Sequence, residues 1–495
     1  MTTQIKAAVV ALAISIGMTG SVAAQTSELK IGNFLDVTSW DPALADIGFD
    51  GPYMSAVYDP LVTLDADGDI AAVLATDWEY SDDLLTLTMN LRSGITFSDG
   101  EIFDAEAAVA SLEHLKSGAR SGEAYLKVDS IMAVDADTIE IRLSERDDTM
   151  LYLMGLGRSY MMSPEAIISD TLTTGPVGSG PYTLEASVPG SEYHFSKKPG
   201  HWDEATYPYE AISIYPIIDH TARHNAMLSG QLNVAYAQPL NNDQATMAGW
   251  NIAEAPSGWV GLQILDHAGD RLAPLGELEV RQALNHAFDG AAILQAIGQG
   301  AGNVTNQVFP VGTPAYDAEL DSMYVYNMEA AKALLAEAGY ADGFSLNMPM
   351  SPIFAQWQPV VQQTFGELGI DVTWDDMQMP DYQINAPTYP MFIALIAVDN
   401  DPSANFARQV ATSQWYNPDP DYTKFPEVNN LIETARLASP EDQLPIIRQV
   451  NQKLTELAWW SVWYQAANTY HSTADVSVTG VTGMMFPTLR FVQPN

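Results

Sequence analysis

The chain has 495 residues, no cysteine, 21 lysine and arginine residues and 62 aspartate and glutamate residues, so its formal net charge is −41. This excess of acids excludes binding to nucleic acid or to an anionic membrane surface, because both need lysine and arginine to neutralise phosphate. The absence of cysteine excludes disulfide bonds and attachment through a lipid-modified cysteine.

The first residues have the pattern of a secretory signal peptide. Lys6 is the only charged residue before Glu28, an apolar run follows it at 7–16, and small residues lead up to Ala24. The run is shorter than the about 20 apolar residues of a membrane-spanning helix. We therefore expect residues 1–25 to be removed on export, which predicts a soluble protein in a Gram-negative periplasm that is not a lipoprotein.

A strand, a turn and a capped helix are predicted in the first quarter of the chain. Apolar and polar residues alternate at 85–92, which is the period of a half-buried strand. Asp99-Gly100 is a turn signal. Asp104 then precedes an amphipathic helix at 105–116, since a short acidic side chain accepts hydrogen bonds from the first turn of a helix.

Similar patterns continue to the C-terminal half. Asn327 is placed to cap a helix that Gly339 ends. Strands that alternate with helices predict an α/β protein. The further expected elements are a strand at 29–33, a hairpin at 58–68, a strand at 138–143, a strand–helix–strand unit at 212–236, helices at 278–294 and 326–344, and a strand at 368–374.

The order of these elements resembles the family-5 extracellular solute-binding proteins of ABC importers, the dipeptide, oligopeptide and nickel type. "YDPLV" at 58–62, "GSGPYTL" at 178–184 and "LEVRQALNHAFDGAAIL" at 278–294 are similar to motifs of that family, and they occur in the family's order. The resemblance implies an α/β, periplasmic-binding-protein type II fold. It has two α/β lobes around a hinged cleft and an extra inserted domain.

The resemblance also implies a division into three domains. Domain II, the inserted domain, would be 55–170, and domain III, a ligand-binding lobe, would be 266–470. The chain would cross between the lobes near Asp266 and near Tyr470, which would form the hinge. Domain I, the other ligand-binding lobe, would combine 26–54, 171–265 and 471–495.

We find no motif of a known enzyme class that fits its expected context. The chain has no Gly-x-Ser-x-Gly and no His-Glu-x-x-His sequence. His220 and His224 are four residues apart on an expected helix, a spacing that allows a shared metal ion, but a pair on the surface is the simpler interpretation. We predict no catalytic residue, metal or cofactor, and a secreted hydrolase with a carboxylate pair stays the alternative from another class.

Three aromatic residues are candidates for contact with a ligand, because binding pockets combine aromatic walls with a few polar groups. Trp259 and Tyr464 lie in segments that resemble the two strands joining the family's lobes. Successive strand residues face opposite sides, so only one of Tyr464 and the preceding tryptophan could face the cleft. Trp40 lies in a loop that resembles the family's x-Asp-Pro-Ala loop. Packing in a core is the alternative for each.

The segment 391–409 resembles the family's strand and loop in which an aspartate receives the terminal ammonium group of a peptide. In the register of the peptide binders this aspartate would fall on Val398, whereas Asp399 is displaced by one position. Either the loop is one residue shorter, or the anchor for the amine is missing. Asn400 is a further candidate, and Arg408 could bind a carboxylate or form a salt bridge at the surface.

The resemblance implies a monomeric periplasmic receptor that captures a small peptide-like solute by hinge closure and delivers it to an inner-membrane ABC permease. No insertion into the membrane and no nucleic-acid partner are expected. A cationic amino-acid derivative or an oligosaccharide is the alternative solute. A sensory receptor that delivers its ligand to a chemoreceptor or a kinase would share the binding step.

Overall fold

The computed structural model describes residues 28–418, 420 and 422–495. The expected signal peptide at 1–25 therefore lies outside the described residues. Among the helices that are described, none is long and apolar enough to cross a membrane.

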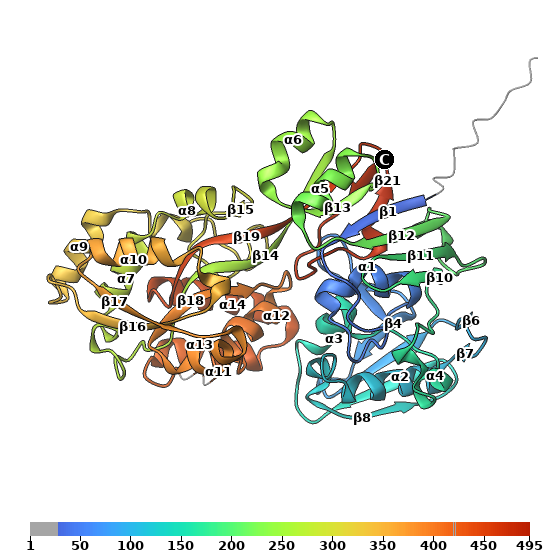
Figure 1. Cartoon of the computed structure of the whole chain (residues 1–495). Helices are drawn as coiled ribbons and strands as arrows, with labels where there is room; N and C mark the ends of the chain where they lie inside the picture. The colour runs from blue at the N-terminus through green and yellow to red at the C-terminus, as the bar shows by residue number, and fades with distance from the viewer. Residues whose placement is uncertain (1–27, 419, 421) are drawn as a thin grey trace, which may run out of the picture.

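A large mixed sheet joins the two lobes of the molecule (Figure 1). Its strand order is β10-β11-β12-β1-β13-β19-β14-β18, with β15 added beside β19. β1 is parallel to both of its neighbours, and the other pairs are antiparallel. The strands are β1 (Glu28–Asn33), β10 (Tyr182–Val188), β11 (Glu192–Lys197), β12 (Ala211–Pro216), β13 (Val234–Ala237), β14 (Asn251–Ile264), β15 (Gly302–Asn303), β18 (Met391–Ala397) and β19 (Trp460–Ser472).

Two hydrophobic cores divide the long strands β14 and β19 between them. Ala255 and Tyr470 belong to the first core, whereas Trp259 and Tyr464 belong to the second. We call residues 28–255 and 467–495 the first lobe and residues 259–466 the second lobe. The ladder between β14 and β19 shifts its register between Pro256 and Gly258, at the point where the cores change. A β-bulge of this kind bends the ladder locally.

A four-stranded antiparallel sheet, β4-β5-β9-β8, lies in the first lobe, and α2 packs on it. The predicted strand at 85–92 is confirmed as Thr86–Leu91, and the turn at Asp99-Gly100 is confirmed by a φ of +94° at Gly100. The helix after Asp104 is confirmed too, and the Asp104 side chain accepts a hydrogen bond from the Ala107 amide at 3.0 Å. The elements here are α1 (Ile47–Val57), β2 (Val62–Leu64), β3 (Ile70–Ala72), β4 (Ala75–Tyr80), β5 (Thr86–Leu91), β6 (Ile95–Thr96), β7 (Ile102–Phe103), α2 (Ala105–Ser117), β8 (Val128–Ala133), β9 (Thr138–Leu143), α3 (Met150–Leu153) and α4 (Pro164–Ile168).

Asp59 binds this part of the first lobe to the segments that flank strands β10 and β11 of the large sheet. Its buried carboxylate accepts hydrogen bonds from Ser179 Oγ at 3.1 Å, from His201 Nε2 at 3.1 Å and from Trp202 Nε1 at 3.2 Å. The remaining elements of the first lobe are α5 (His220–Leu228), α6 (Asn242–Met247), β20 (Val476–Val478) and β21 (Val492–Pro494). The largest hydrophobic core of this lobe contains residues of both predicted domains I and II, and the boundary between them stays a prediction.

Helices surround the second lobe's own strands. The cap at Asn327 and the end at Gly339, whose φ is +88°, are confirmed. The prediction of a single helix at 278–294 is wrong. Extended backbone at Phe288 divides this segment into two helices, and Asp289 caps the second. The elements are α7 (Leu278–Ala287), α8 (Gly290–Ala296), α9 (Met328–Glu337), β16 (Ser345–Met350), α10 (Gln358–Glu367), β17 (Asp371–Asp376), α11 (Met379–Asn385), α12 (Pro402–Phe406), α13 (Pro426–Leu437) and α14 (Pro440–Glu456).

Candidate functional site

A cavity of about 460 Å³ lies where the two lobes meet. Cavities between domains are common ligand sites, because both walls can contribute contacts and can move apart. Residues 123–153 of the first lobe and 399–436 of the second form its walls. The lining residues are Glu123, Leu126, Lys127, Arg146, Asp147, Asp148, Thr149, Leu153, Asp399, Ser403, Ala404, Phe406, Ala407, Arg408, Ala411, Thr412, Ser413, Gln414 and Arg436.

An ion pair between Asp399 and Arg408 forms the charged part of the second-lobe wall. Arg408 donates from Nε to Asp399 Oδ2 at 2.5 Å and from Nη2 to Asp399 Oδ1 at 3.3 Å. The Asp399 side chain is 3% exposed and that of Arg408 is 27% exposed. Attraction by the carboxylate raises the pKa of Arg408 above its ordinary value, so the guanidinium stays charged.

The chain reaches this pair through the end of β18. Val398 is fully buried, and the Asp399 amide donates to Asn405 Oδ1 at 3.0 Å. Asp401 caps α12 by accepting from the Ala404 amide at 2.7 Å. These two hydrogen bonds fix the turn between strand and helix, which orients the Asp399 carboxylate toward Arg408.

Arg146 lies on the first-lobe wall. Its Nε donates to Asp148 Oδ1 at 2.7 Å, and its Nη1 donates to the Ala438 carbonyl of the second lobe. Its Nη2 is buried and has no acceptor among the described residues. Lys127 Nζ donates to the Arg146 carbonyl at 3.0 Å. Arg146 therefore supplies positive charge to the cavity and contacts both lobes.

Asn400 joins the lobes beside the cavity. Its Nδ2 donates to the Asp67 carbonyl at 2.5 Å, and its backbone amide donates to the Tyr152 hydroxyl at 3.2 Å. Asp148 Oδ2 accepts from Gln443 Nε2 at 3.2 Å and adds another polar contact between the lobes. The structure thus has the lobes in contact at the cavity.

The lining is electrically balanced, although the chain is not. It contains four of the chain's 21 lysine and arginine residues and four of its 62 acids. Its formal charge is therefore 4 − 4 = 0, in a chain of −41. A solute with charges of both signs can be bound here without a large electrostatic penalty.

The structure places the predicted aromatic residues in packed surroundings and not in the lining of this cavity. Trp40 is half-buried and packs edge-on against Tyr53 at a centroid distance of 6.3 Å. Trp259 is fully buried and donates from Nε1 to Gln409 Oε1 at 3.1 Å. Tyr464 is buried and accepts from Trp357 Nε1 at 3.2 Å. Their contact with a ligand stays a prediction.

Of the predicted site residues, Asp399 and Arg408 are brought together and line the cavity, and Asn400 lies beside it. Arg146, Lys127 and Arg436 were missed by sequence reasoning. The available signal was the rarity of basic residues in so acidic a chain, but nothing in the sequence places Arg146 in the same cavity as Arg408.

The two histidines considered for a metal ion do not form a surface pair. His220 begins α5, whereas His224 is buried and shares a 2.7 Å hydrogen bond with Gln244 Oε1. The interpretation of both as surface residues is therefore wrong for His224, because it packs toward α6.

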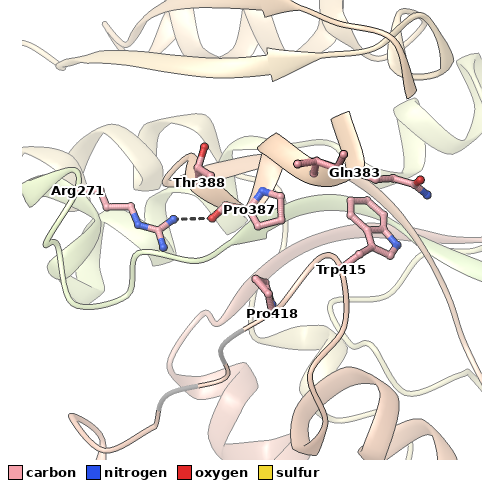
Figure 2. A pocket seen from close by; sticks show the side chains of 7 residues that line it. Arg271, Gln383, Pro387, Thr388, Trp415 and Pro418 are labelled. Atoms are coloured by element: carbon pink, nitrogen blue, oxygen red, sulfur yellow. Dashed lines mark hydrogen bonds between the residues drawn. The ribbon is translucent and has the colours of Figure 1, made fainter. Parts of the chain in front are cut away.

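Another hollow, of about 480 Å³, lies on the second lobe alone (Figure 2). Arg271 at one side donates from Nη1 to the carbonyls of Pro387 at 2.8 Å and Tyr389 at 2.9 Å, while Trp415 stands at the other side. Because Arg271 is used to hold the loop after α11, this hollow has fewer free polar groups than the cavity between the lobes.

The comparison with protein families decides the class of the molecule. Residues 69–418 match the model of the bacterial extracellular solute-binding proteins, family 5. The chain belongs to this family. The family assignment made from the sequence is thereby confirmed.

Relatives and solved structures agree with this assignment. The chain is 28% identical over 382 residues to the glutathione-binding protein GsiB of Salmonella paratyphi A, covering 73% of this chain and 72% of GsiB. The structure of HbpA2 from Haemophilus parasuis matches with a TM-score of 0.81 and 19% identity, over 95% of this chain and 100% of that one. NikA from Brucella suis, in complex with Fe(III)-EDTA, matches with a TM-score of 0.78 and 21% identity, over 94% and 100%.

These likenesses confirm the predicted α/β, periplasmic-binding-protein type II fold. The two lobes and the paired strands between them are the features that such a fold predicts (Figure 1). The family is one of solute-binding proteins, and its description names no solute.

Proposed function

We propose that this protein is the solute-binding component of an ABC importer and that it captures a small peptide-like solute in the cavity between its lobes. The observation that carries the proposal is the cavity itself, with the Asp399–Arg408 pair on one wall and Arg146 on the other. Each wall belongs to a different lobe, so a bound solute would hold the lobes together.

The hinge of this motion would be the paired strands β14 and β19. The register shift between Pro256 and Gly258 lies where the two cores meet, and Ser257 Oγ there donates to the Ala466 carbonyl at 3.1 Å. A bend at this point moves one packed lobe against the other without breaking either core. Opening would separate Asn400 from Asp67, which exposes the cavity to solvent.

Closure is favoured by the solute because the closed form offers it both walls. A ligand shifts a conformational equilibrium only by the difference in its affinity for the two forms. The open form would present the solute with Arg408 alone, and the closed form would add Arg146. The closed protein then docks on the permease, which releases the solute when the lobes part.

A peptide-like solute fits the charges of the lining. Peptides carry a carboxylate, an ammonium group and amides, and the lining has basic, acidic and hydroxyl side chains within one cavity. The relative GsiB is named as a glutathione-binding protein, and glutathione is a small peptide. A volume of about 460 Å³ is within the range of pockets for small molecules, about 300–1,000 Å³.

No chemical step is part of the proposal. A hydrolase of the carboxylate type needs two acids that are free to exchange protons with the substrate. All four acids of the lining are bound within the protein. Asp399 and Glu123 accept hydrogen bonds from Arg408 and Arg158, Asp147 accepts one from Thr149, and Asp148 accepts from Arg146 and Gln443. The protein would act as a monomer outside the cytoplasmic membrane, exported by the signal peptide expected at 1–25.

Isothermal titration calorimetry and small-angle scattering test the proposal together. Glutathione and a panel of di- and tripeptides are titrated into the purified protein, and the radius of gyration is compared with and without each binder. We expect at least one peptide to bind, to reduce the radius of gyration and to be recovered unchanged. Binding without any change in shape, or recovery of a cleaved peptide, would contradict the proposal.

A further inference from the structure

We propose that the cavity holds its solute by a carboxylate group, on Arg408 and Arg146, and that Asp399 does not anchor a free ammonium group. This inference rests on the proposed function and names the part of the solute that faces each wall. It is carried by the hydrogen bonds of Asp399 and Arg408, by the exposure of Arg408 and by the distribution of charge in the chain.

Asp399 is already bound within the protein. Both of its carboxylate oxygens accept hydrogen bonds from Arg408, and its side chain is 3% exposed. An incoming ammonium group would have to displace a guanidinium that is held at two points. Removing one partner of a buried ion pair leaves an uncompensated charge, so such a displacement is unfavourable.

Arg408 keeps donor capacity on the side of the cavity. Its Nε and Nη2 bind Asp399, and in the part of the chain that the structure describes Nη1 donates to no carboxylate or carbonyl, although the Tyr416 hydroxyl also interacts with this side chain. A guanidinium carries five N–H donors in a rigid plane, so one edge can hold a protein carboxylate while the rest meets a second acceptor. The 27% exposure of this side chain, in the cavity lining, leaves room for that contact.

Arg146 lines the same cavity from the other lobe. Its fixed position, between Asp148 and the Ala438 carbonyl, adds a second guanidinium to the same cavity. The other two basic residues of the lining, Lys127 and Arg436, are paired with Glu145 at 3.6 Å and Glu433 at 3.2 Å and contribute mainly long-range potential.

The charge of the whole chain makes this arrangement selective. At −41, most of the surface attracts cations and repels anions, so a cationic solute would need no special site. Basic residues offset this repulsion of an anionic group, and this lining contains about a fifth of the chain's lysine and arginine residues, four of 21. The concentration therefore points to a carboxylate as the group that is recognised.

The test uses glutathione and a panel of tripeptides, each in three forms: unmodified, N-acetylated, and with its carboxylates converted to methyl esters. Affinities are measured by calorimetry on the full mature protein at low ionic strength. We expect the N-acetylated form to retain its affinity within about threefold and the ester to lose at least about tenfold, the effect of removing one charge-assisted contact. If the ester kept its affinity and the N-acetylated form lost it, the inference would be overturned.

Variants separate the inference from simple loss of folding. Arg408→Gln removes the donor and frees Asp399, so the preference should invert, with the ester bound more tightly than the N-acetylated form. Asp399→Asn with Arg408→Gln keeps a neutral hydrogen-bonded pair and should bind neither form well while retaining the melting temperature. Arg146→Gln should weaken binding of the N-acetylated form. Arg142→Gln is the matched control, because Arg142 is exposed and lies outside the cavity.

The outcomes distinguish the inference from the proposed function. If no peptide binds in any form, the peptide-like solute is wrong and the inference fails with it. If peptides bind and Arg408→Gln or Arg146→Gln changes no affinity, the function stands and the carboxylate site is wrong. An inverted preference in Arg408→Gln, with unchanged binding in Arg142→Gln, supports the inference.

Discussion

Arg408 holds the carboxylate of Asp399 through two hydrogen bonds, at 2.5 and 3.3 Å, within the wall of the cavity between the lobes. In the sequence these residues were separate candidates for binding opposite ends of a peptide. Their pairing means that a change to either residue alters the charge that the other presents to a solute.

Replacement of Asp399 by alanine should destabilise the protein by about 3 kcal/mol, because it leaves the Arg408 guanidinium charged and only partly solvated. The free energy of unfolding is measured by urea titration at pH 7. Lys332→Ala is the control, since its ion pair with Glu329 is exposed and such pairs contribute about 0–1 kcal/mol. Equal effects of the two substitutions would show that the Asp399–Arg408 pair is not structurally important.

Gly68→Ala should hinder closure of the lobes. The φ of Gly68 is +87°, and a Cβ atom there would lie 2.4 Å from Nδ2 of Asn400, on the other lobe. We expect a larger radius of gyration in the presence of solute and at least about tenfold weaker binding, because closed and open forms differ in their contacts with it.

Gly200→Ala provides the matched control for this substitution. Its φ is +76°, so the backbone strain is similar, about 1–2 kcal/mol, but no atom lies within 4 Å of the added carbon. The control should lose stability and keep its affinity. Equal loss of affinity in both variants would contradict the role of the contact between Gly68 and Asn400.

His114 should make the fold less stable as the pH rises above neutrality. Its Nε2 lies 3.0 Å from both carboxylate oxygens of Asp41, and this hydrogen bond raises the pKa of His114 above its ordinary value. A base whose pKa is raised in the folded state stabilises the fold. This contribution is complete at pH values below the unfolded pKa, about 6.5, and is lost as the pH rises through the folded pKa. His114→Gln should remove this part of the pH profile of the melting temperature.

Asp50 should also make the fold more stable as the pH falls, although it is an acid and His114 is a base. Burial raises the pKa of this carboxyl to about 6, although Thr38 and the Asp46 amide donate hydrogen bonds to it. An acid with a raised pKa favours the folded state when protonated, so this contribution grows as the pH falls from above 6 toward 4, by up to about 3 kcal/mol. Asp50→Asn should flatten the unfolding free energy between pH 4 and 7, and an unchanged slope would contradict the assignment.

Local elements were predictable because their signals are local. The cap at Asp104, the turn at Asp99-Gly100 and the glycine end at Gly339 depend on residues within one or two turns of the chain. The break at Phe288 was missed because apolar residues keep a helical period on both sides of it, and the period outweighed the capping signal of Asp289.

The candidate site was predictable only in part. Asp399 and Arg408 are nine residues apart, so one motif contained both. Arg146 reaches the same cavity from the other lobe, and only the packing of the lobes decides that contact. The burial of Trp259 and Tyr464 was not predictable either, because an aromatic residue has the same sequence pattern on a cleft wall and in a core.

The two strands between the lobes give the second lobe an unusual kind of modularity. Trp259 lies opposite Gln465 in the ladder of β14 and β19, so the polypeptide leaves for the second lobe and returns from it at neighbouring points. A stretch of about two hundred residues with adjacent ends behaves as a cassette. Exchanging that cassette between relatives would replace one wall of the solute site in a single recombination, while the first lobe and its hydrophobic core stay unchanged.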